Sequence, residues 1–447
     1  MSSVEAFGYR QELQRALSTR DLVIYGMIFM VPIAPFSVFG FVWNDARGMV
    51  PLAYLIGLVG MCFTAMSYAT MSRAFPTAGS VYAYVGRGLH PTAGFYAGWL
   101  ILLDYILVPA LLYIFSIVAL RPLLPLVPDW LWLPIFVSFN AMVNLIGVEL
   151  SARVNLWMLA LELAILAVFI VVGLAALYRG QGAGGLTLLP LYDPAVFSLH
   201  TLASATSIAV LSFLGFDGIS TLAEESTAGR NSVGRATLLA LTLVGLLFIA
   251  QTWIAADLAR GSVFAAADTA FYELAQRAGG TALRVAILLM IVLASAIANA
   301  MAAQAAVARI LYAMARDGRL PAPLARIHPR FHTPYVSTLW VALISLLVGL
   351  LFSRHVDELT RLVNCGALCG FVLLHLAVIN YFFIRQRSGA WIRHLLMPLC
   401  GLLVIGYVLY GMDLAAKGMT ALWIAGGILY FALFPRYRRA ARAAPGA

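Results

Sequence analysis

The chain has few charged residues and few cysteines, and it lacks the motifs of the common hydrolases. Only 11% of its 447 residues are Asp, Glu, Lys or Arg, whereas 62% are hydrophobic and the mean hydropathy is +0.92. Soluble globular domains do not have this composition, so we predict an integral membrane protein. The sequence contains no GxSxG or HExxH motif. We therefore expect no enzyme activity and no cofactor.

Cysteine placement and the distribution of charge argue against further classes of site and function. All four cysteines lie in apolar runs, so we expect neither a disulfide framework nor a metal site: they are Cys62, Cys365, Cys369 and Cys400. The formal net charge is +10, but the basic residues are spread over alternate loops. This pattern argues against a nucleic-acid interface. No repeat of polar residues suggests the continuous pore of a channel.

Twelve apolar runs account for nearly the whole chain. Each is close to the roughly 20 residues that a helix needs to cross a bilayer. The runs lie at about 21–43, 50–72, 94–120, 131–148, 154–178, 201–224, 236–257, 283–314, 335–353, 360–384, 395–412 and 419–435. We therefore predict an all-α membrane protein with twelve transmembrane helices.

The basic residues also predict the orientation in the membrane. Lys and Arg number 19 on the N-terminal side of the membrane and 9 in the opposite loops, while Arg309 lies within a run. Cytoplasmic loops carry the excess of basic residues, so both termini should be cytoplasmic. Residues 1–20 would form a cytoplasmic segment without the features of a signal peptide, and residues 436–447 a basic cytoplasmic tail.

Two of the twelve runs contain residues that interrupt a helix. The first contains Pro32 and Pro35, which lack an amide donor, and the sixth contains Gly215, Asp217 and Gly218. A carboxylate at bilayer depth costs about 2.5 to 3.5 kcal/mol, and non-helical backbone there must line protein or a cavity. We interpret the two breaks as parts of a substrate or ion site.

The broken runs head two sets of five. The first repeat would cover 21–180 and the second 201–384, with two extra helices at 395–435. Because five is an odd number, the second set would enter the membrane from the opposite side. The sequence thus predicts a 5+5 inverted repeat with discontinuous helices 1 and 6, an architecture that moves solutes by alternating access.

Three segments resemble a known transporter superfamily. They are FPTAGSVYAY at 75–84, FLGFDGISTLAEE at 213–225 and ARDGRLPAPLARIHPRFHTP at 315–334. On these segments the chain resembles the amino acid, polyamine and organocation transporters over nearly its whole length. The resemblance implies a LeuT-like fold, secondary active transport and a multi-pass protein of the plasma membrane, which is a bacterial inner membrane here.

Within that superfamily the chain is most similar to bacterial putrescine importers. The similarity rests on Pro32, Gly98-Trp99, Leu103-Asp104-Tyr105 and Cys365-Gly366-Ala367-Leu368. Ser37 stands where those importers carry an aspartate, and Glu162 where they tend to carry a glutamine. An amine importer and an amino acid permease therefore both remain open.

The residues expected to bind substrate come from the two breaks and from the third and eighth runs. They are Pro32, Ile33, Ala34, Ser37, Asp104, Tyr105, Phe213, Gly215, Phe216, Asp217 and Asn299. The carboxylates of Asp104 and Asp217 suit a substrate ammonium, and the Tyr105 ring can add a cation–π contact. The alternative for these side chains is a structural role in helix packing or in hydrogen bonds between helices.

Two further roles are expected of acidic residues. Glu162 or Asp217 would carry a coupling proton, since a buried carboxyl disfavours its ionised form; the alternative for Glu162 is a neutral hydrogen-bonded side chain. Glu224 and Glu225, at the end of the sixth run, would pair with Arg230, Arg235 or Arg309 to close an inner gate, unless they simply form a solvated helix end.

These observations together predict a secondary transporter. It would import a small cationic amine such as putrescine by proton symport, with the solute, protons and the lipid bilayer as its partners. An amino acid permease working by symport or exchange is the first alternative. A membrane sensor that binds the solute without transporting it is the second, and only flux separates it from a transporter.

Overall fold

The computed structural model describes residues 17–75, 80–146, 148–227, 229, 231–353 and 355–433. The predicted tail at 436–447, residues 1–16 of the N-terminal segment, residues 76–79 of the first resembling segment and Arg230 lie outside the described residues. Helices dominate what is described. An isolated bridge between Leu17 and Ser226 is the only β pairing within these ranges.

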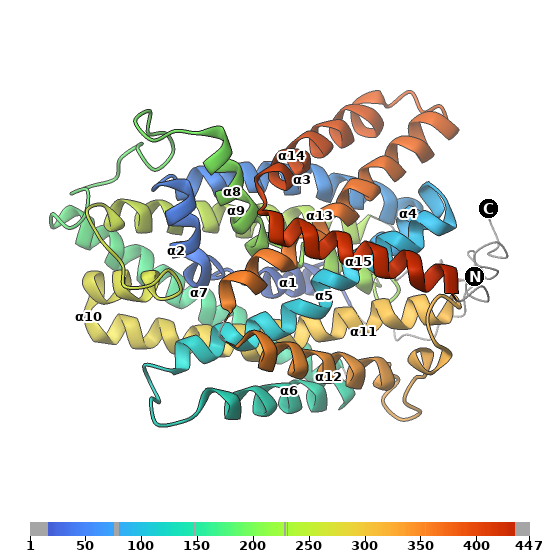
Figure 1. The fold of residues 1–447 in the computed structure, drawn as a ribbon, viewed down its shortest axis with the longest axis horizontal. Coiled ribbons are helices and arrows are strands. Elements are labelled where there is room, and N and C mark those ends of the chain that lie inside the picture. The colour runs from blue at the N-terminus through green and yellow to red at the C-terminus, as the bar shows by residue number, and fades with distance from the viewer. Residues whose placement is uncertain are drawn as a thin grey trace.

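The helices follow the predicted runs (Figure 1). The first half of the chain forms α1 (Thr19–Met30), α2 (Pro35–Ala46), α3 (Val50–Ala74), α4 (Ser80–Gly88), α5 (Pro91–Leu120), α6 (Asp129–Ile146) and α7 (Val148–Tyr178). The next part forms α8 (Leu199–Ala209), the 3₁₀ segments η2 (Val210–Phe213) and η3 (Phe216–Leu222), α9 (Ser232–Ala259), α10 (Ala270–Ile291), the π-helical η4 (Val292–Asn299) and α11 (Ala300–Arg316). The last part forms η5 (Ala322–Ala325), α12 (Tyr335–Phe352), α13 (Val356–Val378), η6 (Ile379–Arg385), η7 (Ile392–Leu396), α14 (Met397–Gly411) and α15 (Leu414–Leu433).

The number of membrane spans agrees with the prediction. In the described chain eleven helical stretches are long and apolar enough to cross a membrane, and the bent pair of α1 and α2 makes a twelfth. The eighth span departs most from its predicted limits, since its apolar stretch begins at Ala270, well before residue 283. A turn at Gly280, with φ of 72°, joins this early helical segment to the rest.

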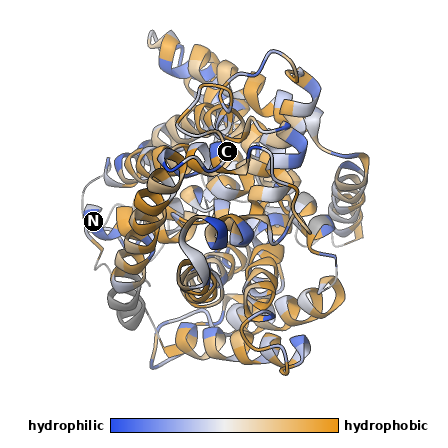
Figure 2. Ribbon diagram, turned by 90° about the vertical axis from the view of Figure 1, so that its left-hand side faces the viewer, coloured by the Kyte–Doolittle hydropathy of each residue, from blue (hydrophilic) through white to orange (hydrophobic). Residues whose placement is uncertain are grey.

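The outward faces of the bundle are apolar, as a lipid environment requires. Hydrophobic residues predominate along the helices, with hydrophilic residues in the loops and in some helical segments (Figure 2). Val171, Leu403 and Leu422 are each about two-thirds exposed or more. A helix that is hydrophobic on its exposed side as well as its buried side is typical of a membrane span.

The backbone leaves the α-helix at both predicted breaks. α1 ends at Met30, where Val31 takes a φ of 50°, and α2 starts at Pro35 at an angle of 52° to α1. In the sixth span α8 passes into η2, Leu214 is extended and Gly215 has a φ of 112°. Only glycine adopts that backbone conformation without strain, so Gly215 determines where the second break falls.

The two breaks lie against each other through close glycine contacts. A Cβ built on Gly215 would lie 2.8 Å from the Phe29 ring, and one built on Gly218 would lie 2.3 Å from it. A Cβ built on Gly26 would in turn lie 2.3 Å from Cδ1 of Ile219. The absence of side chains at these glycines therefore lets α1 and the broken sixth span cross at contact distance.

The described start of the chain and its described end lie at the same end of the bundle. Leu17, just before α1, exchanges backbone hydrogen bonds with Glu225 and Thr227. Near the end of α15 the Tyr430 hydroxyl donates to the Arg319 carbonyl, which follows α11. α11 also carries Arg309, the side-chain partner of Glu225, so these contacts share one end.

Candidate functional site

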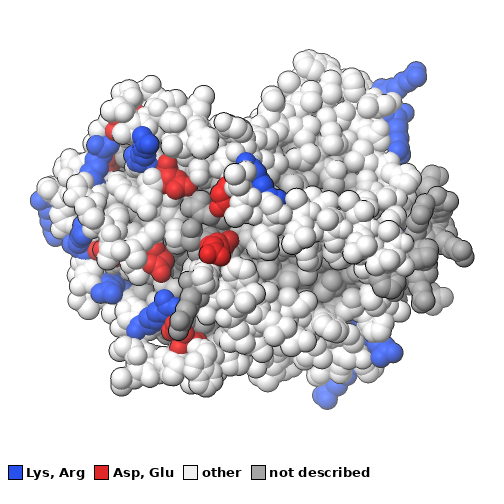
Figure 3. All heavy atoms as spheres, in the orientation of Figure 1, with Lys and Arg blue, Asp and Glu red and all other residues white. Residues whose placement is uncertain are grey.

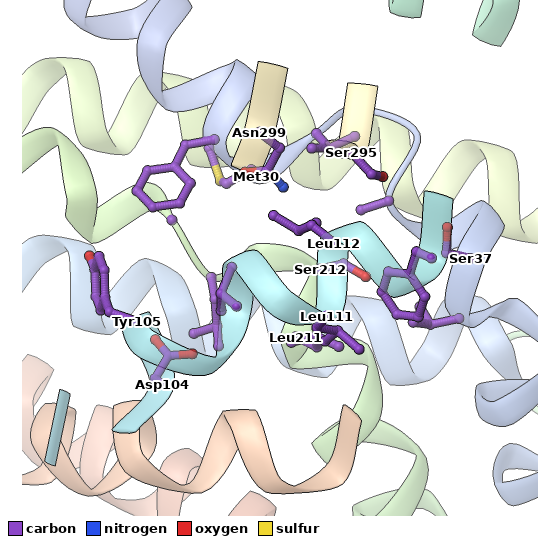
Figure 4. A pocket seen from close by; sticks show the side chains of 18 residues that line it. Met30, Ser37, Asp104, Tyr105, Leu111, Leu112, Leu211, Ser212, Ser295 and Asn299 are labelled. Carbon is purple, nitrogen blue, oxygen red and sulfur yellow. The ribbon is translucent and has the colours of Figure 1, made fainter. Parts of the chain in front are cut away.

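A cavity lies where the two broken spans meet α5 and η4 (Figure 4). Its volume is about 50 Å³, which gives room for a small solute of a few heavy atoms. Most of its wall is apolar. Six of its lining residues have polar side chains: Ser37, Asp104, Tyr105, Ser212, Ser295 and Asn299.

The polar groups are unevenly distributed around the wall. Asp104 and Tyr105 lie at one end of the cavity, Ser37 lies at the other, and Leu111 and Leu112 of α5 lie between them (Figure 4). Asp104 is the sole acidic residue that lines the cavity, and it is 3% exposed. Its Oδ1 atom has no hydrogen-bond partner among the described residues. The cavity therefore has one acidic end and one end with neutral hydroxyl groups.

The expected substrate-binding residues fall into two groups. Those that line the cavity are Ala34, Ser37, Asp104, Tyr105, Gly215 and Asn299. Those that do not line it are Pro32, Ile33, Phe213, Phe216 and Asp217. The first group gathers residues from four spans at one place, as a binding site requires.

Asp217 lies behind the cavity wall. Its Oδ2 atom accepts a hydrogen bond of 2.7 Å from the Tyr105 hydroxyl and a longer one of 3.4 Å from the Tyr68 hydroxyl. Phe29 packs edge-on against Tyr105, with 6.1 Å between ring centroids, and both rings line the cavity. Asp217 thus contacts the cavity wall through Tyr105, and a substrate would reach it only if these rings moved.

The two phenylalanines of the sixth span are fully buried in separate aromatic clusters. Phe213 packs against Tyr54 and Phe248 at 6.0 and 5.1 Å between centroids. Phe216 packs against Tyr68 and Phe371 at 5.8 and 5.6 Å. In this state both rings hold helices together.

Residues of the first break have backbone partners. The Pro32 carbonyl accepts a hydrogen bond of 2.8 Å from the Gln251 side chain of α9. The amides of Ala34, Phe36 and Ser37 donate to the carbonyls of Val31, Ile33 and Ala34 at 2.8, 3.0 and 3.2 Å. These amides are therefore already engaged within the break.

Glu162 lies on α7, away from the cavity wall. Its side chain is fully buried, and neither carboxylate oxygen has a hydrogen-bond partner among the described residues. Burying a carboxyl group without a partner costs least when the group is protonated. This environment is compatible with the proton-carrying role predicted for Glu162.

Two ion pairs lie at one end of the bundle. Arg309 Nε lies 2.8 Å from Glu225 Oε1, and Arg316 lies 3.3 Å from Glu224. The predicted group of Glu224, Glu225 and Arg309 is therefore split between two pairs. Sequence analysis missed Arg316, although its place seven residues, or about two helical turns, after Arg309 puts it on the same face of the helix and was a usable signal.

Three aromatic rings pack together toward the opposite end. Phe36 of α2 stacks on Phe271 of α10 with 3.9 Å between centroids, and Phe169 of α7 lies 5.4 Å from Phe36. All three rings are buried. The cavity thus lies between an ionic layer and an aromatic layer, and α1, the break and α2 run from one layer to the other.

Sequence analysis also missed several polar partners inside the bundle. Tyr68 of α3 reaches Asp217, and Asn140 of α6 donates to the Ala296 carbonyl of η4. An asparagine in an apolar run was a usable signal for Asn140, because polar groups in membrane helices usually bond to another helix. Within the described residues no group of three His, Cys, Asp or Glu side chains is placed to hold a metal ion.

Comparisons with known proteins agree with this architecture. Residues 21–427 match the amino acid permease family. The low-affinity putrescine importer PlaP of Escherichia coli K12 is 31% identical over 433 residues, which cover 95% of this chain and 94% of PlaP. The branched-chain amino acid permease BcaP of Bacillus subtilis is 28% identical, covering 84% of this chain and 83% of BcaP. A methylthioribose transporter of the same species is 24% identical, covering 98% and 96%.

Proposed function

Because the chain belongs to the amino acid permease family, and is accordingly a membrane transporter and not an enzyme, we propose that it imports a small cationic amine such as putrescine. The observation that carries this proposal is the Asp104 carboxylate, which lines the cavity with one oxygen atom unpartnered among the described residues. A substrate ammonium can donate to that oxygen in a charge-assisted hydrogen bond. PlaP, the relative at 31% identity, is a putrescine importer.

The first break favours an amine over an amino acid. An α-amino acid brings a carboxylate, which needs free backbone N–H groups at a helix break. Ala34, Phe36 and Ser37 already donate to backbone carbonyls, and Pro32 and Pro35 have no N–H group, which leaves the N–H of Ile33 as the one remaining donor between Pro32 and Ser37. At the hydroxyl end Ser37 offers neutral hydrogen bonding, which suits a monoamine or a second amino group that is weakly held.

Transport would follow alternating access between the two closed layers. The ionic layer around Glu225 and Arg309 would open toward the cytoplasm, and the aromatic layer around Phe36 and Phe271 toward the outside. Spans 1–5 and 6–10 would form the inverted repeats that move relative to each other. Proton symport would use Glu162 or Asp217, both of which are buried carboxylates that do not line the cavity.

The test is uptake of labelled putrescine into proteoliposomes with an acidic exterior. We expect accumulation that a protonophore abolishes and that other amines inhibit. Asp217→Asn should lose proton-driven accumulation and keep exchange of external for internal putrescine, because its loss removes a proton carrier and leaves Asp104 in place.

Other outcomes would support the alternatives. Inhibition by amino acids alone would identify an amino acid permease, for which BcaP is the precedent. Uptake that ignores the proton gradient and needs internal substrate would identify an exchanger. Saturable binding of putrescine without flux would identify a sensor.

A further inference from the structure

The eighth span leaves α-helical geometry where it forms the cavity wall. η4 (Val292–Asn299) is π-helical over eight residues. Such segments are rare and are frequently found at functional sites; η6 and η7 are also π-helical, but neither lines the cavity. Ser295 and Asn299, two of the six polar residues of the wall, belong to this segment.

Asn140 of α6 is hydrogen-bonded to the π-helical segment. Its Nδ2 atom donates to the Ala296 carbonyl at 2.5 Å and to the Phe136 carbonyl at 3.1 Å, and it lies 3.2 Å from the Tyr113 hydroxyl. Because carbonyl oxygens only accept hydrogen bonds, these partners fix the orientation of the carboxamide. Asn140 is fully buried, and α6, α5 and η4 all meet at its side chain.

The rest of α6 makes this asparagine conspicuous. Ile135, Phe139 and Met142 on the same helix are each more than 40% exposed and face outward. A carboxamide is costly in such a helix unless it bonds to another helix, so its place here indicates a specific partner. That partner is the carbonyl of Ala296, the residue that follows Ser295.

We propose that Asn140 is a positioning residue of the substrate site, which holds η4 in the register that turns Ser295 and Asn299 into the cavity. Through Tyr113 the same carboxamide contacts α5, which carries Asp104. Asn140 thereby fixes two walls of the cavity relative to each other. The inference concerns whichever solute the protein carries and does not depend on its being an amine.

Asn144 provides a matched control one turn further along α6. Its Nδ2 atom donates to the Met301 carbonyl at 3.1 Å and to Gln304 Oε1 at 2.8 Å. Both acceptors lie on α11, beyond the π-helical segment, and neither residue lines the cavity. Asn140→Leu and Asn144→Leu therefore each remove a bond between the same two spans, but only the first acts on the cavity wall.

The kinetic test first offers labelled putrescine and labelled L-leucine to wild-type proteoliposomes. The solute that they take up is then used to measure KM and Vmax of each variant. Asn140→Leu should raise KM about tenfold, equivalent to about 1.4 kcal/mol, with Vmax within about twofold of wild type. Asn144→Leu should leave KM unchanged. In a Ser295→Ala, Asn299→Ala background Asn140→Leu should raise KM by much less than in wild type, since most of its effect passes through those two side chains. Additive effects, or equal effects of the two asparagines, would overturn the proposal.

A second readout needs no transported solute. With the four native cysteines replaced, Asn299→Cys is labelled by a small cationic thiosulfonate reagent. Asn140→Leu should change the labelling rate at least about fivefold, the effect of roughly 1 kcal/mol, whereas Asn144→Leu should not. An unchanged rate in Asn140→Leu contradicts the positioning role. Because this result is obtained even if putrescine is not carried, failure here is distinct from failure of the proposed amine import.

Discussion

Asp104 is the residue on which the charge of the substrate depends, because it is the one acidic side chain that lines the cavity. We expect Asp104→Asn to raise KM for a cationic amine by roughly 10- to 100-fold, since a hydrogen bond to a charged group contributes about 1.5 to 3 kcal/mol. Concentration-dependent uptake measures this. Glu358→Gln, which changes an exposed carboxylate far from the cavity, should leave KM unaltered. An unchanged KM in Asp104→Asn would mean that the ammonium binds elsewhere.

Gly218 is the residue on which the contact between the broken spans depends. Its Cβ position is 2.3 Å from Cε1 of Phe29, so Gly218→Ala should lower both thermal stability and transport. Phe29→Leu should partly restore stability in the same chain, because the smaller side chain makes room. Gly406→Ala on α14 is the control, since nothing lies within 4 Å of its Cβ position. The midpoint temperature of the detergent-solubilised protein reports each effect, and a Gly218→Ala midpoint equal to wild type would contradict the contact.

Individual roles were harder to predict than the site as a whole. The sequence identified Asp104 and Asp217 because a carboxylate in an apolar run is costly. It did not show that Asp104 lines the cavity while Asp217 lies behind Tyr105. Successive helical residues point roughly 100° apart, so a rotation set by packing of the whole bundle decides which acid faces the solute. The same reason explains why Phe213 and Phe216 were expected at the cavity and lie in packed clusters.

At the scale of elements, the buried pair of Glu225 and Arg309 joins the sixth span to α11. Their side chains are 6% and 9% exposed, so removing one partner leaves a buried charge and should cost about 3 to 5 kcal/mol. We therefore expect Arg309→Ala to lower the midpoint of thermal unfolding substantially. The pair of Arg121 and Asp129 has the same 2.8 Å distance, but its side chains are 42% and 39% exposed. Arg121→Ala should consequently cost less than about 1 kcal/mol. Equal shifts for the two variants would show that the inner pair does not hold the elements together.

The elements themselves were largely predictable. Each span is an apolar run of nearly fixed length, because the bilayer sets that length, and most predicted limits lie within a few residues of the helices. Proline pairs and glycines predicted where two spans break. The π-helical geometry of η4 was not predictable, and its hydrogen-bond partner Asn140 lies 156 positions away in the chain. The early start of α10 was missed because Gln276 and Arg277 interrupt the apolar pattern there.

At the scale of the whole molecule, the distribution of charge determines how the bundle sits in the membrane. On the face in Figure 3 the acidic side chains lie over the half that carries α2 and α10, whereas basic side chains occur at both ends. The opposite end contains the ion pairs of Glu224 and Glu225 and the described start and end of the chain. Orientation follows the excess of Lys and Arg in cytoplasmic loops, to which acidic residues contribute little, and 19 of the 29 basic residues belong to the N-terminal side of the membrane. The asymmetry therefore predicts that the ionic layer faces the cytoplasm and the aromatic layer faces outward.

That orientation makes a prediction for reporter fusions. A green fluorescent protein fused after Ala447 should be fluorescent, and alkaline phosphatase fused at the same point should be inactive. The reason is that the start of α1 and the end of α15 would both be on the cytoplasmic side. Alkaline phosphatase inserted in the loop between α7 and α8, near Gly184, should be active, because an odd number of spans separates it from the C-terminus. The reverse pattern would place the aromatic layer inside. The ionic layer would then face outward, and the predicted cytoplasmic position of both termini would be wrong.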